Sequence, residues 1–150
     1  MKRTMDVALS LFGLIILSPM LIILSLAIKI ESPGPVFYRG VRVGRNGNPF
    51  RIFKFRSMVE NADKLGIDST STNDMRVTRI GYIIRKFKLD EFSQLINVLM
   101  GDMSLVGPRP EVQKFVNMYT EEEKQILTVR PGITDWASIK FHNEGEILEA

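Results

Sequence analysis

Cysteine is absent from this 150-residue chain, and histidine occurs once, as His142. Without cysteine the chain can form neither a disulfide framework nor a thiolate metal site, which fits a reducing compartment. A single histidine argues against a histidine-based catalytic triad and against a zinc cluster, so we interpret His142 as a structural residue.

Charged residues are absent from residues 7–28, VALSLFGLIILSPMLIILSLAI. This run is as long as a membrane helix, which needs about 20 apolar residues. It is too long for the core of a cleaved signal peptide, and no small-residue cleavage site follows it. A buried helix of a soluble protein is the remaining alternative. We therefore predict a membrane-anchoring helix over residues 1–30 and a single further domain over residues 31–150.

Pro19, preceded by Ser18, interrupts the apolar run near its middle. Proline removes one backbone donor and kinks a helix, and each arm of about 15 to 18 Å is roughly half of a hydrocarbon core. The Ser18 hydroxyl can bond a carbonyl that the kink frees. Basic residues stand on both flanks, namely Lys2 and Arg3 before the run and Lys29, Arg39, Arg42, Arg45, Arg51, Lys54 and Arg56 after it. Since basic flanks favour the cytoplasmic side, we expect a re-entrant helix with both ends on that side.

The rest of the chain predicts a small, mainly helical α+β domain with a short β-hairpin. We expect two short strands in residues 36–57, around the Asn46-Gly47 turn signal. Lys54 and Arg56 would share one strand face, with Phe53 and Phe55 on the other. The remaining expectations are a short helix and mobile loop over 59–75, a basic amphipathic helix over 76–88, a helix over 112–119, a short helix after a Thr120–Glu123 capping box, and a strand over 133–141 with Trp136.

An excess of positive charge indicates an anionic partner. The formal net charge is +3 and the pI is near 9.3, which suits a phosphate ligand, an anionic lipid or a nucleic acid. The cations are spread along the whole chain, and no known nucleic-acid motif accompanies them. We therefore expect no nucleic-acid partner.

Residues 85–110 combine two carboxylates with several cations. Apolar residues recur there at helical spacing, at Leu89, Phe92, Leu95, Ile96 and Leu99, and predict a helix over residues 89–100. Asp90 and Glu91 then occupy its first turn, where unpaired N–H groups favour ionised carboxylates. Acids beside cations suit chemistry on a phosphate, with one acid to attack or bind a metal. Alternatively, the acids only start the helix and the cations form a solvated face.

Several short pieces of the chain follow one another in a recognisable order. They are Lys2-Arg3 with Asp6, Ser18-Pro19, Pro33-Gly34-Pro35-Val36-Phe37, Lys54-Phe55-Arg56-Ser57-Met58, Leu89-Asp90-Glu91, Asn97-Val98-Leu99, Gly101-Asp102-Met103-Ser104, Gly107-Pro108-Arg109-Pro110 and Arg130-Pro131-Gly132-Ile133-Thr134. Together they resemble the monotopic phosphoglycosyl transferases, the bacterial sugar transferase family. Each piece is weak alone, but the ordered match covers nearly the whole chain and is highly specific.

The resemblance implies a two-step exchange on the cytoplasmic face of a bacterial inner membrane, the first membrane step of glycan synthesis. Asp90 would attack the sugar-bearing phosphate of a UDP-sugar and release UMP, and polyprenyl phosphate would then attack the phosphosugar–aspartyl intermediate. Glu91 would bind Mg²⁺ or assist proton transfer. Cations that match family positions, expected to bind substrate phosphate, are Arg85, Arg109, Lys54 and Arg56. The implied partners are a UDP-sugar, polyprenyl phosphate and membrane lipid, with Mg²⁺ as cofactor.

Two departures from the family pattern stand near the end of the sequence. Family members usually continue for several tens of residues past the Pro-Gly-Ile-Thr motif, so we expect a late part of the family fold to be missing here. Asp135 stands where many relatives carry Gly, and Trp136 to Leu148 lacks a common Gly-Arg-Asn, which we interpret as a subgroup difference in sugar choice. The alternative function is a truncated, inactive membrane-bound interaction module, which would show no turnover.

Overall fold

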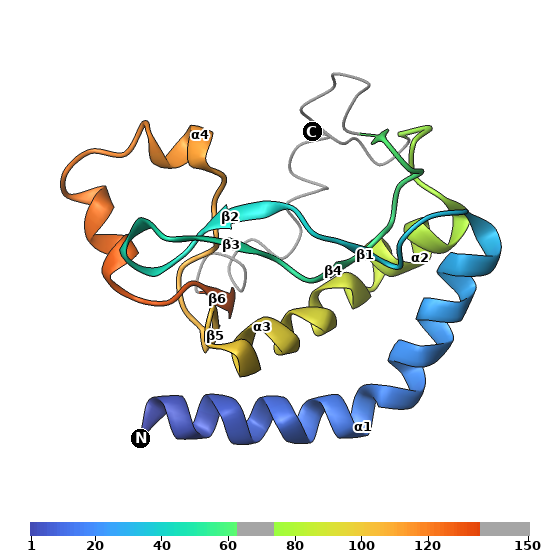
Figure 1. Cartoon of the computed structure of the whole chain (residues 1–150), viewed down its shortest axis with the longest axis horizontal. Helices are drawn as coiled ribbons and strands as arrows, with labels where there is room; N and C mark the ends of the chain where they lie inside the picture. The colour runs from blue at the N-terminus through green and yellow to red at the C-terminus, as the bar shows by residue number, and fades with distance from the viewer. Residues whose placement is uncertain (63–73, 136–150) are drawn as a thin grey trace.

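The computed structural model describes residues 1–62 and 74–135 as helices and short strands (Figure 1). The helices are α1 (Lys2–Glu31), α2 (Arg79–Lys86), α3 (Leu95–Met100) and α4 (Gln113–Val116), with 3₁₀ helices η1 (Arg45–Gly47), η3 (Leu89–Gln94) and η4 (Glu123–Thr128). The strands are β1 (Phe37–Tyr38), β2 (Val41–Val43), β3 (Pro49–Arg51), β4 (Lys54–Phe55), β5 (Ser104–Val106) and β6 (Gly132–Thr134). The prediction of a long apolar helix followed in the sequence by a mixture of helices and strands is confirmed.

Helix α1 continues through Pro19 and bends part-way along its length (Figure 1). Pro19 has no N–H group, so the carbonyl of Ile15, four residues earlier, loses its helical donor. The Ser18 hydroxyl donates a hydrogen bond of 2.7 Å to that same carbonyl oxygen. The predicted satisfaction of a freed carbonyl by Ser18 is therefore confirmed.

Most of the apolar surface of α1 is exposed. The helix is long and apolar enough to cross a membrane by length and composition, and only 11% of its most hydrophobic 18-residue window is buried. Its buried residues are Asp6, Ser10 and Ile28. The core helix of a soluble protein would be buried over most of its apolar side chains, so this exposure favours a membrane environment. Re-entry into the membrane stays a prediction.

The predicted turn at Asn46-Gly47 is confirmed, but the two expected strands are four. Antiparallel β2 and β3 flank the turn, in which Asn46 and Gly47 have φ values of 59° and 78°. β1 and β4 form a separate antiparallel pair. The Phe53 and Phe55 rings both contact Phe37, with centroid distances of 5.5 and 5.1 Å, as expected for one shared face.

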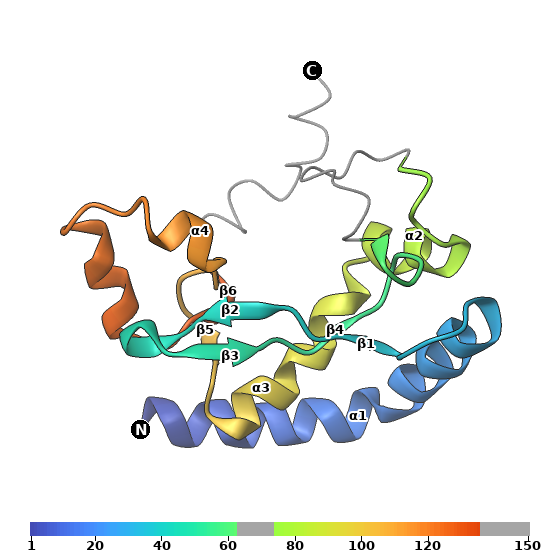
Figure 2. The ribbon, with the colours of Figure 1, turned by 45° about the horizontal axis from the view of Figure 1, so that its top comes forward.

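Helix α3 lies between α1 and the strands β2 to β4 (Figure 2). One core cluster contains Ile28 from α1, Phe55 from β4 and Ile84 from α2, all 3% exposed or less. A second cluster joins Ile52, Val98 and Met103. Parallel strands β5 and β6 form a third pair, of which the sequence predicted only the β6 strand.

Residues 89–100 are not one regular α-helix. The first half is the 3₁₀ helix η3, which begins after Lys88 in the left-handed region at φ 52°. Phe92, predicted to be buried, is 38% exposed, whereas Ser93 and Asn97 are buried. The apolar spacing was misleading because hydrogen bonds to the neighbouring strand segment draw these two polar side chains inward.

The other predicted helices are shorter than expected. The basic helix of residues 76–88 is only α2, in which Ile84 is buried but Ile83 and the following Phe87 are exposed. Of residues 112–119, only α4 is helical. The capping box is confirmed, since the Thr120 amide donates to Glu123 Oε2 at 2.7 Å and the Glu123 amide to Thr120 Oγ1 at 3.2 Å. The expectations for residues 63–73, Trp136 and His142 lie outside the described residues.

Candidate active site

Asp90 lies at the start of η3, where the chain turns after α2. Its side chain is 7% exposed, and its Oδ2 atom forms an ion pair of 3.0 Å with Nζ of Lys54 from β4. The Lys54 side chain is 35% exposed and reaches from the buried carboxylate towards solvent. The structure thus joins a predicted acid and a predicted cation that stand 36 positions apart in the sequence (90 − 54).

Two buried side chains on η3 and α3 hold the strand segment that carries Lys54. The Ser93 hydroxyl lies 3.0 Å from the Phe53 carbonyl and 2.9 Å from the Asp90 carbonyl. Oδ1 of Asn97 accepts from the Phe53 amide at 2.7 Å, and its Nδ2 donates to the Arg51 carbonyl at 2.9 Å. This Ser93–Asn97 clamp fixes Arg51–Phe53 on the helix pair and so places Lys54 beside Asp90.

Sequence reasoning gave the clamp no role. The sequence alone points to Asn97 only as part of a family motif and indicates no function for Ser93. Polar residues four apart in a helical segment share one face, so this spacing inside an otherwise apolar run was a usable signal.

Glu91 faces a cavity of about 1010 Å³ beside the acid pair. Burial raises the pKa of the Glu91 carboxyl, and the neighbouring charge of Asp90 raises it further, whereas Lys54, Arg109 and Lys88 act in the opposite direction. The two acids are neighbours in the sequence but have different surroundings in the fold. Asp90 pairs with a cation in the protein, and Glu91 lines the open space.

The cavity gathers most of the predicted site residues. Those that line it are Lys54, Arg56, Arg85, Glu91 and Arg109, together with further cations including Arg39, Arg42 and Lys114. Asp90 is absent from the lining and adjoins it through Lys54 and Glu91. A cavity bordered by so many cations is suited to a polyanionic ligand.

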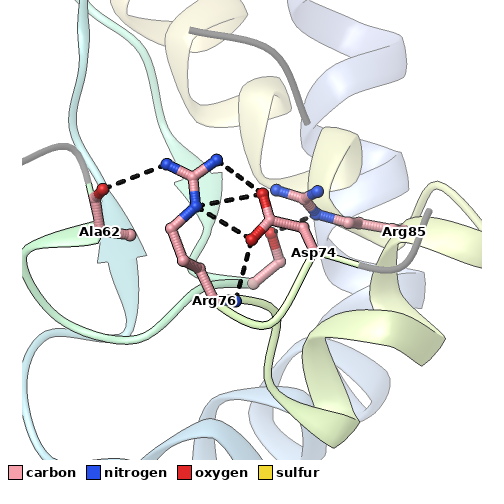
Figure 3. A network of polar contacts seen from close by, with 5 residues as sticks. Ala62, Asp74, Arg76 and Arg85 are labelled. Atoms are coloured by element: carbon pink, nitrogen blue, oxygen red, sulfur yellow. Dashed lines mark hydrogen bonds and ion pairs between the residues drawn. The ribbon is translucent and has the colours of Figure 1, made fainter. Parts of the chain in front are cut away.

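Arg85 belongs to a fixed polar network (Figure 3). Its Nε donates to the Ser57 hydroxyl at 2.8 Å. Burial lowers the pKa of the Arg85 guanidinium, and the charges of Asp90 and Asp74 oppose that change. Arginine stays protonated under such shifts, so Arg85 brings a permanent positive charge to the cavity wall.

Arg76 and Asp74 form the other half of this network (Figure 3). Nη2 of Arg76 lies 2.6 Å from Asp74 Oδ2, and its Nε lies 2.9 Å from Oδ1. The same guanidinium donates from Nη1 to the Ala62 carbonyl at 3.2 Å. The hydrogen bonds that the side chain and the backbone amide of Arg76 donate to Asp74 lower the pKa of the Asp74 carboxyl to about 2. No role for this pair is predictable from the sequence, because a carboxylate and an arginine two positions apart indicate no particular contact.

Arg56 makes hydrogen bonds within the protein itself. Its Nη1 donates to the Pro33 carbonyl at 2.6 Å and its Nη2 to the Ser32 carbonyl at 2.7 Å. Only 7% of the residue is exposed. These bonds fix the chain where it leaves α1, a structural task that the sequence did not suggest, and phosphate binding by Arg56 stays a prediction.

Arg109 follows β5, in a segment whose backbone lies directly against the backbone of residues 132–134. The Gly132 amide donates to the Pro108 carbonyl at 2.9 Å, and the Gly107 amide to the Thr134 carbonyl at 3.1 Å. A side chain on Gly132 would overlap the Gly107 backbone. Both glycines are needed here because the two segments touch through their backbones, and this contact brings Arg109 to the cavity.

A comparison with protein families matches residues 1–149 to the family described as bacterial sugar transferase. The chain belongs to the bacterial sugar transferase family. The resemblance inferred from the short ordered pieces is thereby confirmed over nearly the whole sequence.

Relatives in the bacterial sugar transferase family include proteins of known name. The chain is 45% identical over 141 residues to the UDP-N-acetylgalactosamine-undecaprenyl-phosphate N-acetylgalactosaminephosphotransferase of Aeromonas hydrophila, covering 92% of this chain and 33% of the relative. It is 42% identical to the UDP-glucose:undecaprenyl-phosphate glucose-1-phosphate transferase of Escherichia coli, covering 99% and 33%. Identity to the exopolysaccharide production protein PSS of Rhizobium leguminosarum is 41%, covering 93% and 74%. The chain thus spans about a third of the first two relatives.

Proposed function

We propose that this chain transfers a sugar 1-phosphate from a UDP-sugar to polyprenyl phosphate. The observation that carries the proposal is the pairing of Asp90 with Lys54 at the border of a cation-lined cavity, in a member of the bacterial sugar transferase family. The names of the relatives, which specify undecaprenyl phosphate and nucleotide sugars, support the same substrate classes.

In the first step, a carboxylate oxygen of Asp90 forms a bond to the sugar-bearing phosphorus. The bond from that phosphorus to the oxygen bridging it to UMP breaks, and UMP leaves with the electron pair. In the second step, an oxygen of polyprenyl phosphate attacks the same phosphorus, and the aspartyl oxygen leaves. Asp90 is regenerated, and the product is polyprenyl diphosphate–sugar.

The cations supply what phosphoryl transfer mainly requires, namely position and charge neutralisation. Lys54 compensates the charge of Asp90 before attack. The oxygens of the diphosphate would be bound by two arginines. Arg85 is held in place through its Nε by Ser57, and Arg109 follows strand β5 at the cavity wall. Charge-assisted bonds of this kind are among the strong ones in proteins.

The residues present fit a bound Mg²⁺ with substrate. The described chain has no cluster of three or more acidic or histidine ligands. Mg²⁺ is commonly held by one or two carboxylates together with substrate phosphates and water, and Glu91 lines the cavity as one such carboxylate. When bound, the ion would neutralise charge on the diphosphate. We therefore expect turnover to need Mg²⁺ and to stop in excess chelator, while full activity in chelator would contradict this.

Helix α1 would hold the site at the membrane surface. Both ends of α1 are bonded to the same folded body, at Asp6 through β5 and at Glu31 through α2. A helix crossing the membrane with this packing would carry the polar body into the lipid, at a large cost for each unsatisfied group. These contacts support a re-entrant α1, with the catalytic part on one face of the membrane.

Detergent-solubilised protein incubated with a panel of UDP-sugars and polyprenyl phosphate tests the proposal. We expect UMP release and a lipid-linked sugar with at least one UDP-sugar, and no turnover from folded Asp90→Asn protein. The matched comparison is Lys124→Ala, on the exposed η4 face, which should retain activity, whereas Arg109→Ala should lose most of it. Absence of UMP release from folded wild-type protein across the panel would leave the interaction-module alternative in its place.

A further inference from the structure

A buried carboxylate near the start of α1 is bonded to the strand that leads to the cavity. Asp6 is 6% exposed. Its Oδ2 accepts a hydrogen bond of 2.7 Å from the Ser104 hydroxyl, and its Oδ1 accepts from the Leu105 amide at 3.3 Å. Lys2 adds a third link, donating from Nζ to the Val106 carbonyl at 2.9 Å. One short stretch of α1 therefore bonds all three residues of β5.

Strand β5 is in turn the support of the Gly107–Arg109 segment. On its other side β5 pairs with β6, through Ser104 with Gly132 and Val106 with Thr134. The chain then passes directly from Val106 to Gly107, whose amide bonds the Thr134 carbonyl, and reaches the cavity wall at Arg109. No helix or strand lies between β5 and Arg109. A displacement of β5 would therefore displace Arg109 as well.

We propose that Asp6 is a positioning residue, which sets the place of Arg109 in the cavity by fixing β5 to α1. The inference rests on the proposed function. It adds that the apolar helix does more than anchor, because the same helix that contacts lipid also orients a cavity arginine. The position of α1 is thereby coupled to the geometry of the site.

The geometry indicates that hydrogen bonding at Asp6, rather than its charge, performs this task. Both observed partners are uncharged groups, a hydroxyl and a backbone amide. An asparagine retains one oxygen for the Leu105 amide, and its NH₂ group can donate to the Ser104 hydroxyl, which accepts as well as donates. Asp6→Asn should therefore rescue the function that Asp6→Ala removes.

A double-mutant cycle in the full chain separates positioning from general stability. With Arg109 present, Asp6→Ala should lower kcat/KM for the UDP-sugar by about tenfold or more, as expected for buried groups left without partners. In an Arg109→Ala background the same change should cost less than about threefold, because residues that act through one another are not additive. Asp6→Asn should stay within about threefold of wild type.

Ser10→Ala is the matched control on the same helix. Ser10 is one turn from Asp6 and fully buried, and its hydroxyl has no hydrogen-bond partner among the described residues. Its substitution should leave kcat/KM unchanged. If Asp6→Ala costs the same factor in both backgrounds, or retains wild-type turnover, the proposal is wrong. If Asp6→Ala fails to fold, Ser104→Ala, which removes one of the two bonds, enters the same cycle and is judged by the same outcomes.

Amide hydrogen exchange tests the link without turnover, so failure of the proposed function is distinguishable from failure of this inference. Asp6→Ala should raise exchange at residues 105–109 relative to wild type, and Asp6→Asn and Ser10→Ala should not. If this pattern is found in a protein that releases no UMP, the proposed role of Asp6 in positioning residues 105–109 is supported, and only the proposed transferase reaction is refuted. Unchanged exchange at 105–109 in Asp6→Ala would overturn the link.

Discussion

At the scale of single residues, Asp90 and Glu91 show how neighbours acquire different chemistry. Asp90 is buried against the Lys54 ammonium, whereas Glu91 lines the cavity with a raised pKa. A nucleophile needs a fixed position and a ligand for a metal needs access, so the two environments match the two proposed roles.

Glu91→Gln should differ from Asp90→Asn in the step that it affects. If Asp90 is the nucleophile, Asp90→Asn cannot form an adduct, while Glu91→Gln retains the nucleophile and loses only metal or proton handling. We expect both variants to be severely impaired in UMP release. Incubation with a labelled UDP-sugar and mass spectrometry should detect a phosphosugar adduct on Asp90 in Glu91→Gln protein and none in Asp90→Asn protein. An adduct on a residue other than Asp90 would refute the assignment.

The raised pKa of Glu91 predicts a pH-dependent cost to stability. Its folded-state pKa lies above the unfolded value, mainly because burial disfavours the charged form. The folded state therefore binds the proton more tightly, and this contribution to stability is lost as pH rises through the raised pKa. Glu91→Gln should melt at a higher temperature than wild type at pH 7, with the difference shrinking towards pH 4. A Glu91→Gln protein less stable than wild type at pH 7 would contradict this sign.

At the scale of elements, the Ser93–Asn97 clamp joins η3 and α3 to the strand segment before Lys54. Asn97 is fully buried and bonds the backbone of both Arg51 and Phe53. It bonds the last residue of β3, Arg51, and the residue just before β4, Phe53, across the two-residue gap between these short strands. Local geometry at the acid pair thus depends on one side-chain amide.

Asn97→Ala should be strongly destabilising. The change leaves the part-buried Phe53 amide and Arg51 carbonyl without these partners, at a cost of about 1 to 3 kcal/mol each. We expect a loss of about 3 kcal/mol in the free energy of unfolding, measured by denaturant titration in detergent. Asn117→Ala is the matched control, since Asn117 accepts only an exposed hydrogen bond from Gln113, and it should change stability by less than about 0.5 kcal/mol. Equal effects of the two substitutions would refute the clamp.

At the scale of the whole molecule, α1 underlies the folded body along its length (Figure 2). Lys2, Arg3 and Asp6 bond the α3–β5 corner. At the other end, Glu31 accepts from the Arg79 and Ile80 amides at 2.8 and 2.9 Å. Two ends bonded to one body are expected to lie on one side of a membrane.

Cysteine labelling in intact cells tests this topology, and the cysteine-free sequence makes the background clean. Single cysteines near Met1, near Gly34 and at exposed Glu122 should all resist an impermeant reagent from outside. Replacement of Pro19 by Ala should favour a straight, spanning helix and expose the cysteine near Met1, against the positive-inside preference for Lys2 and Arg3. In the unmodified helix, labelling at Met1 but not at Gly34 would show a true span and refute re-entry.

The features that depend on local chemistry were predictable from the sequence alone. Ser18 and Pro19 act on the backbone within one helical turn, the Asn46-Gly47 turn needs only positive φ, and the Thr120–Glu123 capping box closes over three residues. The ordered short pieces also identified the family. Each of these signals is complete within a few neighbouring residues, so no knowledge of distant contacts was required.

The contacts between residues far apart in the sequence became known from the fold and not from the sequence. In the fold, Lys54 pairs with Asp90, and Arg56 donates to the Ser32 and Pro33 carbonyls. Asp6 accepts a hydrogen bond from Ser104, which lies 98 positions further along the chain. The fold also buries Ser93 and Asn97 while exposing Phe92. Helical periodicity predicts the buried face of a helix from hydrophobicity alone. The backbone N–H and C=O groups of a segment that lacks a strand partner need other hydrogen-bond partners, and these can be polar side chains on a neighbouring helix. That requirement depends on chain segments far apart in sequence, so the folded arrangement had to settle it.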